Sequence, residues 1–240
     1  GALVKRYWSQ PLAVGVDLDG PLAIAVHRRI IQSNPCLEAH YRRWYRECIP
    51  AWEETRNIPG EVVEIGSGAG FLEVAIPGLV RTDALANPFS HRVIDAERMA
   101  FADESLRALF VIGVLHHLPR PGKFLAEAQR CLKPGGRLVL LEPHNSFPQR
   151  FLCRLLDHYE YFDDEVAEWA NQDSGRMTRA NLALPWVIFI RDRARFDAEF
   201  PALRIRDIRH HTFISYLVTG GMSYRPFVPA FALPLVCAAE

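Results

Sequence analysis

The chain has 240 residues, of which 49% are hydrophobic and 23% are charged, and its formal net charge is +0. This composition is that of a globular protein, and the length suits one α/β domain with an insertion or a cap. A charge balance of zero excludes the strong basic field that steers proteins onto nucleic acid or anionic membranes.

The cysteines and the apolar runs bear on the cellular setting. An odd, scattered set of five cysteines predicts reduced thiols in the cytoplasm and argues against a structural zinc site, so no metal is expected. Asp17 and Asp19 interrupt the only early apolar run, which leaves no signal peptide visible. The apolar tail at 227–239 is broken by Pro229 and Pro234, and no stretch reaches the roughly 20 apolar residues of a membrane span.

The first sixty residues predict a poorly patterned arm followed by two helices. Residues 1–20 show no period, whereas 22–31 and 36–47 carry apolar residues three or four apart. Asn34 and Pro35 are typical of an N-cap and a first helical position. The aromatic side chains of the second helix either form a lid over a ligand or cover the edge of a sheet.

A glycine loop follows the first predicted strand. Residues 61–65 form a short, β-branched apolar run of the kind that makes a buried strand. Three glycines then alternate at Gly66, Gly68 and Gly70, and helix-compatible residues follow at 71–76. Glycines let a backbone turn tightly and let a ligand approach it closely. A strand, a glycine loop and a helix N-terminus in this order hold nucleotide-like ligands in α/β folds, although a tight turn without a ligand is the alternative.

The pattern Glu64-x-Gly66-x-Gly68-x-Gly70 resembles motif I of the class I S-adenosylmethionine-dependent methyltransferases. In that family the loop carries the methionine and ribose parts of the cofactor. The dinucleotide fingerprint instead requires glycine or alanine where this chain has Phe71. The resemblance implies that Glu64 anchors the methionine ammonium and that the glycines admit the cofactor to the backbone.

Acidic residues end the next two predicted strands. Residues 79–83 predict a second strand ending at Asp83, whose two carboxylate oxygens can accept from both ribose hydroxyls. The stretch that follows is too short for a helical crossover, so we expect a turn there. Residues 92–97 resemble the family's third-strand motif, which implies that Asp95 accepts from the adenine amino group and that the Ala96 backbone meets the ring.

Two histidines follow the fourth predicted strand, at 108–115. His116 and His117 stand where the ubiquinone/menaquinone C-methyltransferases, which this chain resembles, carry Leu-His-His-Leu. A histidine beside the transferred methyl group can orient an acceptor or take its proton, whereas two structural histidines that cap the next helix are the alternative. Residues 132–136, Leu-Lys-Pro-Gly-Gly, resemble the family's turn before the fifth strand at 137–142.

The resemblance covers residues 61–142. It implies a Rossmann-like α/β methyltransferase fold with a mainly parallel central sheet flanked by helices, an N-terminal helical cap and a helical insertion after strand 5. We expect an arm and cap at 1–58 and a methyltransferase domain at 59–240, divided into a cofactor half at 59–143 and an acceptor insertion with the C-terminal part at 144–240. The implied cofactor contacts are Glu64, Gly66, Ser67, Gly68, Gly70, Asp83, Asp95, Ala96 and Gly113, and the implied catalytic residues are His116 and His117.

Beyond residue 142 the predicted elements are less regular. Apolar spacing predicts helices at 146–161, 163–171 and 187–200 and a sixth strand at 203–210. A seventh strand near 213–218 is either short and irregular or missing. The polar and aromatic candidates to line an acceptor pocket are His144, Asn145, His158, Tyr159, Tyr161, Trp186 and Tyr216, and ordinary packing explains each of them as well.

The resemblance implies methyl transfer from S-adenosylmethionine to a small-molecule acceptor, with S-adenosylhomocysteine as product. The sulfonium is already electrophilic, so the protein mainly aligns the reacting atoms, and a base is needed only if the acceptor loses a proton. The apolar insertion suits a hydrophobic acceptor as well as a buried core. Three alternatives stay open: a nicotinamide-dependent oxidoreductase, a non-catalytic methyltransferase-fold binding or scaffold protein, and a nucleic-acid methyltransferase. We expect no nucleic-acid partner.

Overall fold

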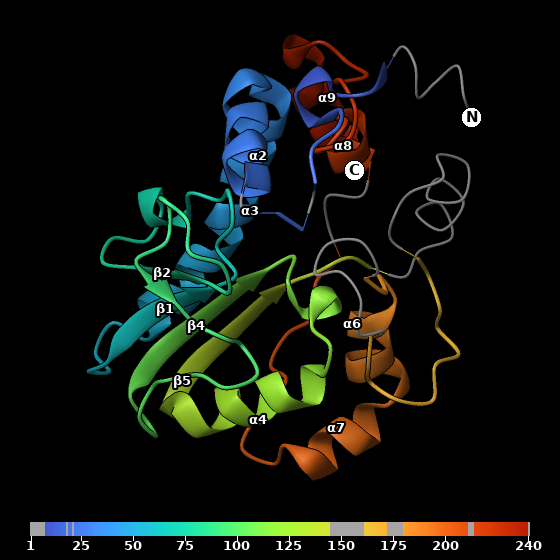
Figure 1. Cartoon of the computed structure of the whole chain (residues 1–240). Helices are drawn as coiled ribbons and strands as arrows, with labels where there is room; N and C mark the ends of the chain where they lie inside the picture. Colours follow the sequence, from blue (N-terminus) through green and yellow to red (C-terminus); the bar gives the residue numbers. More distant parts are fainter. Residues whose placement is uncertain are drawn as a thin grey trace.

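The computed structural model describes residues 8–17, 19–20, 22–144, 161–171, 180–210 and 214–239. Its centre is a five-stranded sheet of order β3-β2-β1-β4-β5, in which every neighbouring pair is parallel (Figure 1). The strands are β1 (Glu61–Ile65), β2 (Val80–Asp83), β3 (Arg92–Val93), β4 (Leu106–Ile112) and β5 (Leu132–Leu141). A parallel sheet flanked by helices is the Rossmann-like α/β fold that the sequence predicts.

Alternate side chains of the central strands enter two separate cores. Val62 of β1 packs with α2 (Leu22–Ser33) and α3 (Pro35–Glu54), whereas Val63 packs with α4 (Pro121–Cys131) and the later helices. Neighbouring residues of β4 divide in the same way. Both faces of the central strands are therefore buried, which explains why these strands are apolar throughout rather than alternating.

The N-terminal cap supplies the helices on one face of the sheet. Asn34 caps α3 by accepting from Leu37 N–H at 3.2 Å, and Pro35 occupies the first turn, as predicted. Only a 3-10 turn at Leu72–Val74 follows the glycine loop, so the helix predicted there is wrong. The segment between β2 and β3 forms turns, as predicted. Since these connections bring little helix to the sheet, α3 covers the strands that they leave open (Figure 1).

The segment after β5 is partly helical. α6 (Leu184–Trp186), a π-helical turn (Val187–Arg191) and α7 (Arg193–Glu199) confirm the helix predicted at 187–200, which begins earlier than expected. The helix predicted at 163–171 is wrong, because buried Asn181 fixes this stretch in an irregular path: its Oδ1 accepts from Asp163 N–H at 3.0 Å. Of the helix predicted at 146–161, only residue 161 lies within the described residues.

The sixth strand predicted at 203–210 is wrong, because this segment joins no strand in the described part of the chain. Two ion pairs connect it to α3 instead. Arg206 lies 3.6 Å from Glu54, and Arg209 lies 3.7 Å from Glu47. These contacts connect the segment to a helix rather than to a strand.

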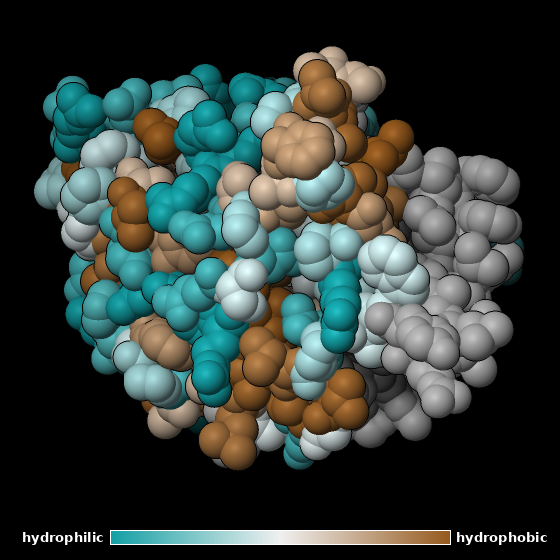
Figure 2. Space-filling model, turned by 90° about the horizontal axis from the view of Figure 1, so that it is seen from above, coloured by the Kyte–Doolittle hydropathy of each residue, from teal (hydrophilic) through white to brown (hydrophobic). Residues whose placement is uncertain are grey.

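The C-terminal part forms α8 (Ile214–Val218) and α9 (Leu233–Ala239) beside α2, so a seventh strand near 213–218 is excluded from 214 onward. The backbone N–H of Gln10 donates a hydrogen bond of 2.9 Å to the Ser223 carbonyl, which connects the N-terminal arm to the C-terminal part. Seen from this end, the surface mixes hydrophilic areas with an apolar area (Figure 2). No helix in the described ranges is long and apolar enough to cross a membrane.

Candidate active site

One cleft runs along the carboxyl ends of β1, β2 and β4, the edge at which open α/β sheets bind ligands. His144, Trp186 and Tyr216 of the acceptor candidates line it, Tyr161 does not, and Asn145, His158 and Tyr159 lie outside the described residues. The cleft is lined by all eleven residues that the sequence singles out for cofactor binding or catalysis, which are Glu64, Gly66, Ser67, Gly68, Gly70, Asp83, Asp95, Ala96, Gly113, His116 and His117.

The glycine loop turns sharply between β1 and the 3-10 turn. Gly66 has φ +66°, and a Cβ there would lie 2.6 Å from a methyl group of Val114. Ser67 N–H donates to the Thr82 carbonyl at 2.8 Å, which ties the loop to β2. Gly68 has φ +48°, and a Cβ there would meet only a carbonyl oxygen, at 3.8 Å. The loop therefore excludes side chains on its inner side and leaves open space at Gly68.

Two buried oxygen atoms at the end of β1 and in this loop have no hydrogen-bond partner among the described residues, namely Oε2 of Glu64 and Oγ of Ser67. Buried polar atoms nearly always have a partner in a folded protein, or receive one from water or a ligand. Burial raises the pKa of Glu64 to about 8; the nearby carboxylates of Glu73 and Asp83 add to this effect, and Arg81 opposes it. An arriving cation would favour the ionised carboxylate and pair with it.

Asp83 connects the glycine loop to the segment after β2. Its Oδ2 accepts from Gly68 N–H at 2.9 Å and its Oδ1 accepts from Leu85 N–H at 2.9 Å. Each carboxylate oxygen has a second lone pair, so Asp83 can still accept from a ligand. The sequence predicts only the ligand contact, and it misses this structural role because the spacing of 15 residues to Gly68 carries no local signal.

Two residues of the N-terminal cap support the same loop, and sequence reasoning missed their contacts. Arg28 donates to the carbonyl oxygens of Ala69 at 3.0 Å and of Gly70 at 2.8 Å. The hydroxyl of Tyr45 accepts from Phe71 N–H at 2.8 Å. The aromatic spacing of the second helix was a signal for Tyr45. Arg28 had none, because its partners lie more than forty residues away in the sequence.

The remaining cofactor candidates lie along the sides of the cleft. Asp95 is exposed, and its Oδ1 accepts from Glu97 N–H at 2.9 Å. Ala96 is buried beside it. Gly113 N–H donates to the Leu141 carbonyl at 2.8 Å at the end of β4. The third-strand motif and the fourth-strand end therefore border the same space as the glycine loop.

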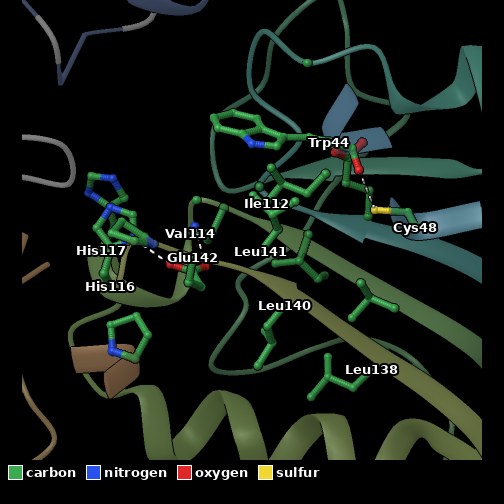
Figure 3. A pocket seen from close by; sticks show the side chains of 18 of the residues that line it. Trp44, Cys48, Ile112, Val114, His116, His117, Leu138, Leu140, Leu141 and Glu142 are labelled. Atoms are coloured by element: carbon green, nitrogen blue, oxygen red, sulfur yellow. Dashed lines mark hydrogen bonds and ion pairs between the residues drawn. The ribbon is translucent and has the colours of Figure 1, made fainter. Parts of the chain in front are cut away.

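The two histidines lie in a 3-10 turn, Leu115–His117, which two residues separate from the end of β4. Nδ1 of His116 lies 2.6 Å from Oε2 of Glu142, and the ring centroids of His116 and His117 are 4.1 Å apart. Oε1 of Glu142 accepts from the Val114 and Leu115 amides (Figure 3). Sequence reasoning missed Glu142, for which the only signal is its position as the last residue of the predicted fifth strand.

An apolar wall separates the histidines from the N-terminal cap. Figure 3 shows Trp44 of α3 on one side of the pocket and the two histidines on another. Ile112, Val114 and Leu141 lie between them at the ends of β4 and β5. This part of the cleft combines apolar surface with one polar corner, a common design of sites for small organic molecules.

The sheet order, the glycine loop after β1 and the acid at the end of β2 define the class of protein, a Rossmann-like domain of the class I methyltransferase type. Residues 61–140 match the methyltransferase domain family. The match covers a third of the chain, and the chain resembles curated ubiquinone/menaquinone biosynthesis C-methyltransferases and demethylmenaquinone methyltransferases.

Two curated relatives and one solved structure illustrate the likeness. The ubiquinone/menaquinone biosynthesis C-methyltransferase UbiE of Geotalea daltonii is 28% identical over 52% of this chain and 57% of that protein. The demethylmenaquinone methyltransferase of Renibacterium salmoninarum is 28% identical over 55% of this chain and 69% of that protein. A candidate S-adenosylmethionine-dependent methyltransferase of Methanococcus maripaludis is 14% identical with a TM-score of 0.43, covering 60% of this chain and 73% of that chain. The chain thus spans little more than half of the Geotalea relative.

S-adenosylmethionine is the methyl donor of this class, and the residues of the cleft fit it. Its ammonium and hydroxyl groups are donors of the kind that Oε2 of Glu64 and Oγ of Ser67 lack. The open space at Gly68 admits a ligand to the backbone, and Asp83 keeps acceptor capacity beside it. The cleft therefore offers hydrogen-bond acceptors that a cationic, hydroxyl-bearing molecule would satisfy.

Proposed function

We propose that this protein transfers a methyl group from S-adenosylmethionine to a small, hydrophobic acceptor. The observation that carries the proposal is the pair of buried oxygen atoms without a partner at the glycine loop, within a segment that matches the methyltransferase domain family. When bound, the cofactor supplies a methyl group on a positive sulfur. The protein binds, orients and excludes water around the reacting groups.

The cofactor residues divide the ligand between them. Glu64 pairs with the methionine ammonium, and Ser67 accepts or donates a hydrogen bond beside it. Gly66, Gly68 and Gly70 keep the backbone accessible, and Asp83 accepts from the ribose hydroxyls. Asp95 and Ala96 border the adenine, and Gly113 borders the reacting end of the cleft.

The acceptor binds between Trp44 and the histidine turn. The apolar wall of Ile112, Val114 and Leu141 suits a hydrophobic acceptor, because contact between them removes apolar surface of both from water. His116 or His117 takes a proton from the acceptor if the reaction requires it. The names of the curated relatives make reduced demethylmenaquinone the first acceptor to test.

The sequence-based division of the chain is retained as part of the proposal. Residues 1–58 form the arm and cap, 59–143 the cofactor half, and 144–240 the acceptor insertion and C-terminal part. The contacts of Arg28 and Tyr45 with the glycine loop support a cap that belongs to the active site. The zero net charge supports a small-molecule acceptor over nucleic acid, and free cysteines in the described ranges support a cytoplasmic location.

Calorimetry separates this proposal from a nicotinamide enzyme. The protein should bind S-adenosylmethionine and not NAD, because Phe71 stands where the dinucleotide loop needs a small residue. Gly66→Ala should weaken binding of S-adenosylmethionine by about tenfold or more, since its Cβ would clash with Val114 in a left-handed backbone. Gly78→Ala is the matched control: φ is +79° but nothing lies within 4 Å, so affinity should be unchanged.

Turnover separates an enzyme from a non-catalytic binding protein. Incubation with S-adenosylmethionine and reduced demethylmenaquinone should release S-adenosylhomocysteine and yield a methylated product, measured by mass spectrometry. Binding without acceptor-dependent release, over a panel of hydrophobic quinols and phenols, would favour the scaffold alternative. Tight binding of NAD with no affinity for S-adenosylmethionine would overturn the proposal.

A further inference from the structure

The outer edge of β5 has no neighbouring strand in the described part of the chain. β5 lies at the end of the sheet and pairs with β4 alone. The Leu141 carbonyl accepts from Gly113 N–H, so the backbone groups of Leu141 face β4. Because successive residues of a strand direct their N–H and C=O groups to opposite sides, those of Leu138 and Leu140 face away from the sheet. Each of these two residues therefore leaves one donor and one acceptor without a strand partner.

A second stretch of unpaired backbone lies opposite this edge. Residues 137–141 of β5 and residues 204–209 line the same cavity. Glu54 of α3 connects these two walls, since its carboxylate lies 2.8 Å from the Arg137 guanidinium and 3.6 Å from that of Arg206. The backbone at 204–209 takes part in no hydrogen bond within the described ranges. We call the space between the two walls the edge slot.

The side chains along both walls follow the two faces of the sheet. Leu138 and Leu140 are half-buried and pack on the core that α4 covers, and Figure 3 shows them lining the pocket. Leu203 and Ile205 pack on the same core. Arg206 instead reaches α3, on the opposite face. The side chains of this second wall thus alternate as those of a strand do, although no strand within the described ranges joins it to β5.

The unpaired backbone groups determine what kind of molecule fits the edge slot. A small hydrophobic molecule would cover the half-buried leucines but leave the donors and acceptors of both walls unpaired, which is unfavourable away from water. An extended peptide segment carries donors and acceptors on both of its sides at the spacing of a strand, so it would bond to both walls. The β5 edge of a second copy does not fit, because the β4 of that copy would lie where this chain has residues 204–209.

The charges of the slot indicate the polarity of such a segment. Lys133 and Arg204 line the same cavity, and neither forms an ion pair within the described ranges. Arg137 and Arg206 share the carboxylate of Glu54. Acidic residues on an incoming segment would complement these cations, whereas basic residues would be repelled by them.

We propose that the edge slot binds an extended, acidic segment of a partner protein, which adds a strand between β5 and residues 204–209. Its apolar side chains cover Leu138 and Leu140, and its acidic side chains pair with Lys133 and Arg204. The sheet then continues past β5, and residues 204–209 gain the strand edge that their alternating pattern fits. The proposal does not depend on methyl transfer, since none of these residues belongs to the proposed cofactor contacts.

The probe is a peptide of about seven residues, close to the usual length of a strand, in which valine alternates with threonine and a glutamate stands at each end. Amide exchange of the whole chain is followed residue by residue by NMR, with and without this peptide. The peptide should slow exchange at Leu138 and Leu140 by about tenfold or more, and it should slow exchange within 204–209. Val139 and Leu141 should be unchanged, because their amides already donate to β4.

Two variants at one position separate backbone pairing from packing. Leu140→Pro removes the outward N–H and leaves the bonds to β4, whereas Leu140→Ala keeps that N–H, and both remove the leucine side chain. Leu140→Pro should weaken peptide binding by about tenfold or more relative to Leu140→Ala, measured by fluorescence anisotropy of a labelled peptide. A matched peptide with lysine in place of both glutamates should bind more weakly to the wild type, and one with proline at its centre should not bind.

The remaining outcomes would overturn the proposal. Absence of binding by the acidic peptide at its solubility limit, or equal slowing at every residue of 138–141, would exclude strand addition. Slow exchange at Leu138 and Leu140 in the monomer without peptide would show that the chain fills its own slot. The same result in a dimer detected by light scattering would show that a second copy fills it. If Leu140→Pro does not fold, the alternation of slowed and unchanged amides in the wild type decides the question.

Discussion

The central strands and the segment at 203–210 differ in how firmly the sequence specifies their structure. Within residues 61–142, β1 and β4 take part in three parallel strand pairs, and their apolar side chains are almost fully buried on both faces. Residues 203–210 begin instead with alternating apolar residues, Leu203 and Ile205, and they form no strand. An alternating pattern therefore specifies which side chains face a core, while a strand also needs a neighbouring edge to which its backbone can bond.

Charge explains where the second segment goes. Leu203 and Ile205 still pack on the core, as their period predicts. Arg206 and Arg209 pair with acidic residues of α3, which places the segment beside a helix. The difference teaches that a period of apolar residues can place side chains against a core without forming a strand, and that each exposed ion pair contributes little by itself.

The largest expected effect compares one leucine from each region. Leu109→Ala in β4 should lower the free energy of unfolding by about 2–5 kcal/mol, because this fully buried side chain would leave a cavity that both neighbouring strands enclose. Leu203→Ala should cost about 1.5 kcal/mol or less, since that side chain is only partly buried. Urea unfolding of both variants measures the difference, and equal losses would contradict the contrast between the regions.

A second effect depends on pH. Burial raises the pKa of Glu64 to about 8, so the folded protein keeps this proton while the unfolded chain releases it at an ordinary carboxyl pKa. Proton release then favours the unfolded state, and the free energy of unfolding should fall as the pH rises from about 5 to about 8. Glu64→Gln should be more stable than the wild type at pH 8 by about 4 kcal/mol, and equal to it near pH 4.

The matched control for Glu64→Gln lies on the same strand. Glu61 is exposed and pairs with Arg92 at 2.9 Å. Glu61→Gln should change stability by about 0.5 kcal/mol at most, with no trend between pH 5 and 8. Thermal unfolding in parallel over this range gives the comparison. A constant difference between wild type and Glu64→Gln at all pH values would show that the buried carboxyl does not titrate as expected.

The sequence predicts the fold most accurately where local signals and burial agree. The β-branched run of β1, the Asn34 cap and the absent helix after β2 could each be read from a few residues, since each depends on local chemistry. The irregular path at 163–171 could not, because it depends on Asn181, which is distant in sequence. The segment expected to be helical after Gly70 forms a single 3-10 turn, Leu72–Val74, and Pro77 and Gly78 follow three residues later.

The candidate site follows the same division. Its glycines and strand-end acids were predicted because β1, β2 and β4 bring their carboxyl ends to one edge, whatever the rest of the chain does. Arg28 and Glu142 were missed because their partners are backbone groups of remote loops. Every residue type carries these backbone groups, so the residue types in the sequence do not indicate which loop a distant side chain will contact.

Asp83 tests whether its two roles can be separated. Asp83→Ala should weaken S-adenosylmethionine binding by about 1–3 kcal/mol, because it removes both a charged acceptor and the bond that orients Gly68. Asp83→Asn keeps one acceptor oxygen, so it should recover part of this loss while lacking the charge. Calorimetry with both variants measures the two losses of affinity for S-adenosylmethionine. Unchanged affinity in a folded Asp83→Ala protein would remove this residue from the cofactor site.

The smallest effect is a difference in hydrogen–deuterium exchange of backbone amides. It tests the segment at 203–210, which was predicted to be a strand. Amides that join no strand exchange with solvent far faster than those of a buried ladder. Residues 204–209 should therefore exchange deuterium within the first time points of a mass-spectrometric experiment, whereas residues 108–111 of β4 should stay protected. S-adenosylmethionine should slow exchange at 66–70 and leave 204–209 unchanged. Protection of 204–209 equal to that of β4 would mean that a partner edge exists for this segment, and that its alternating pattern had predicted a strand correctly.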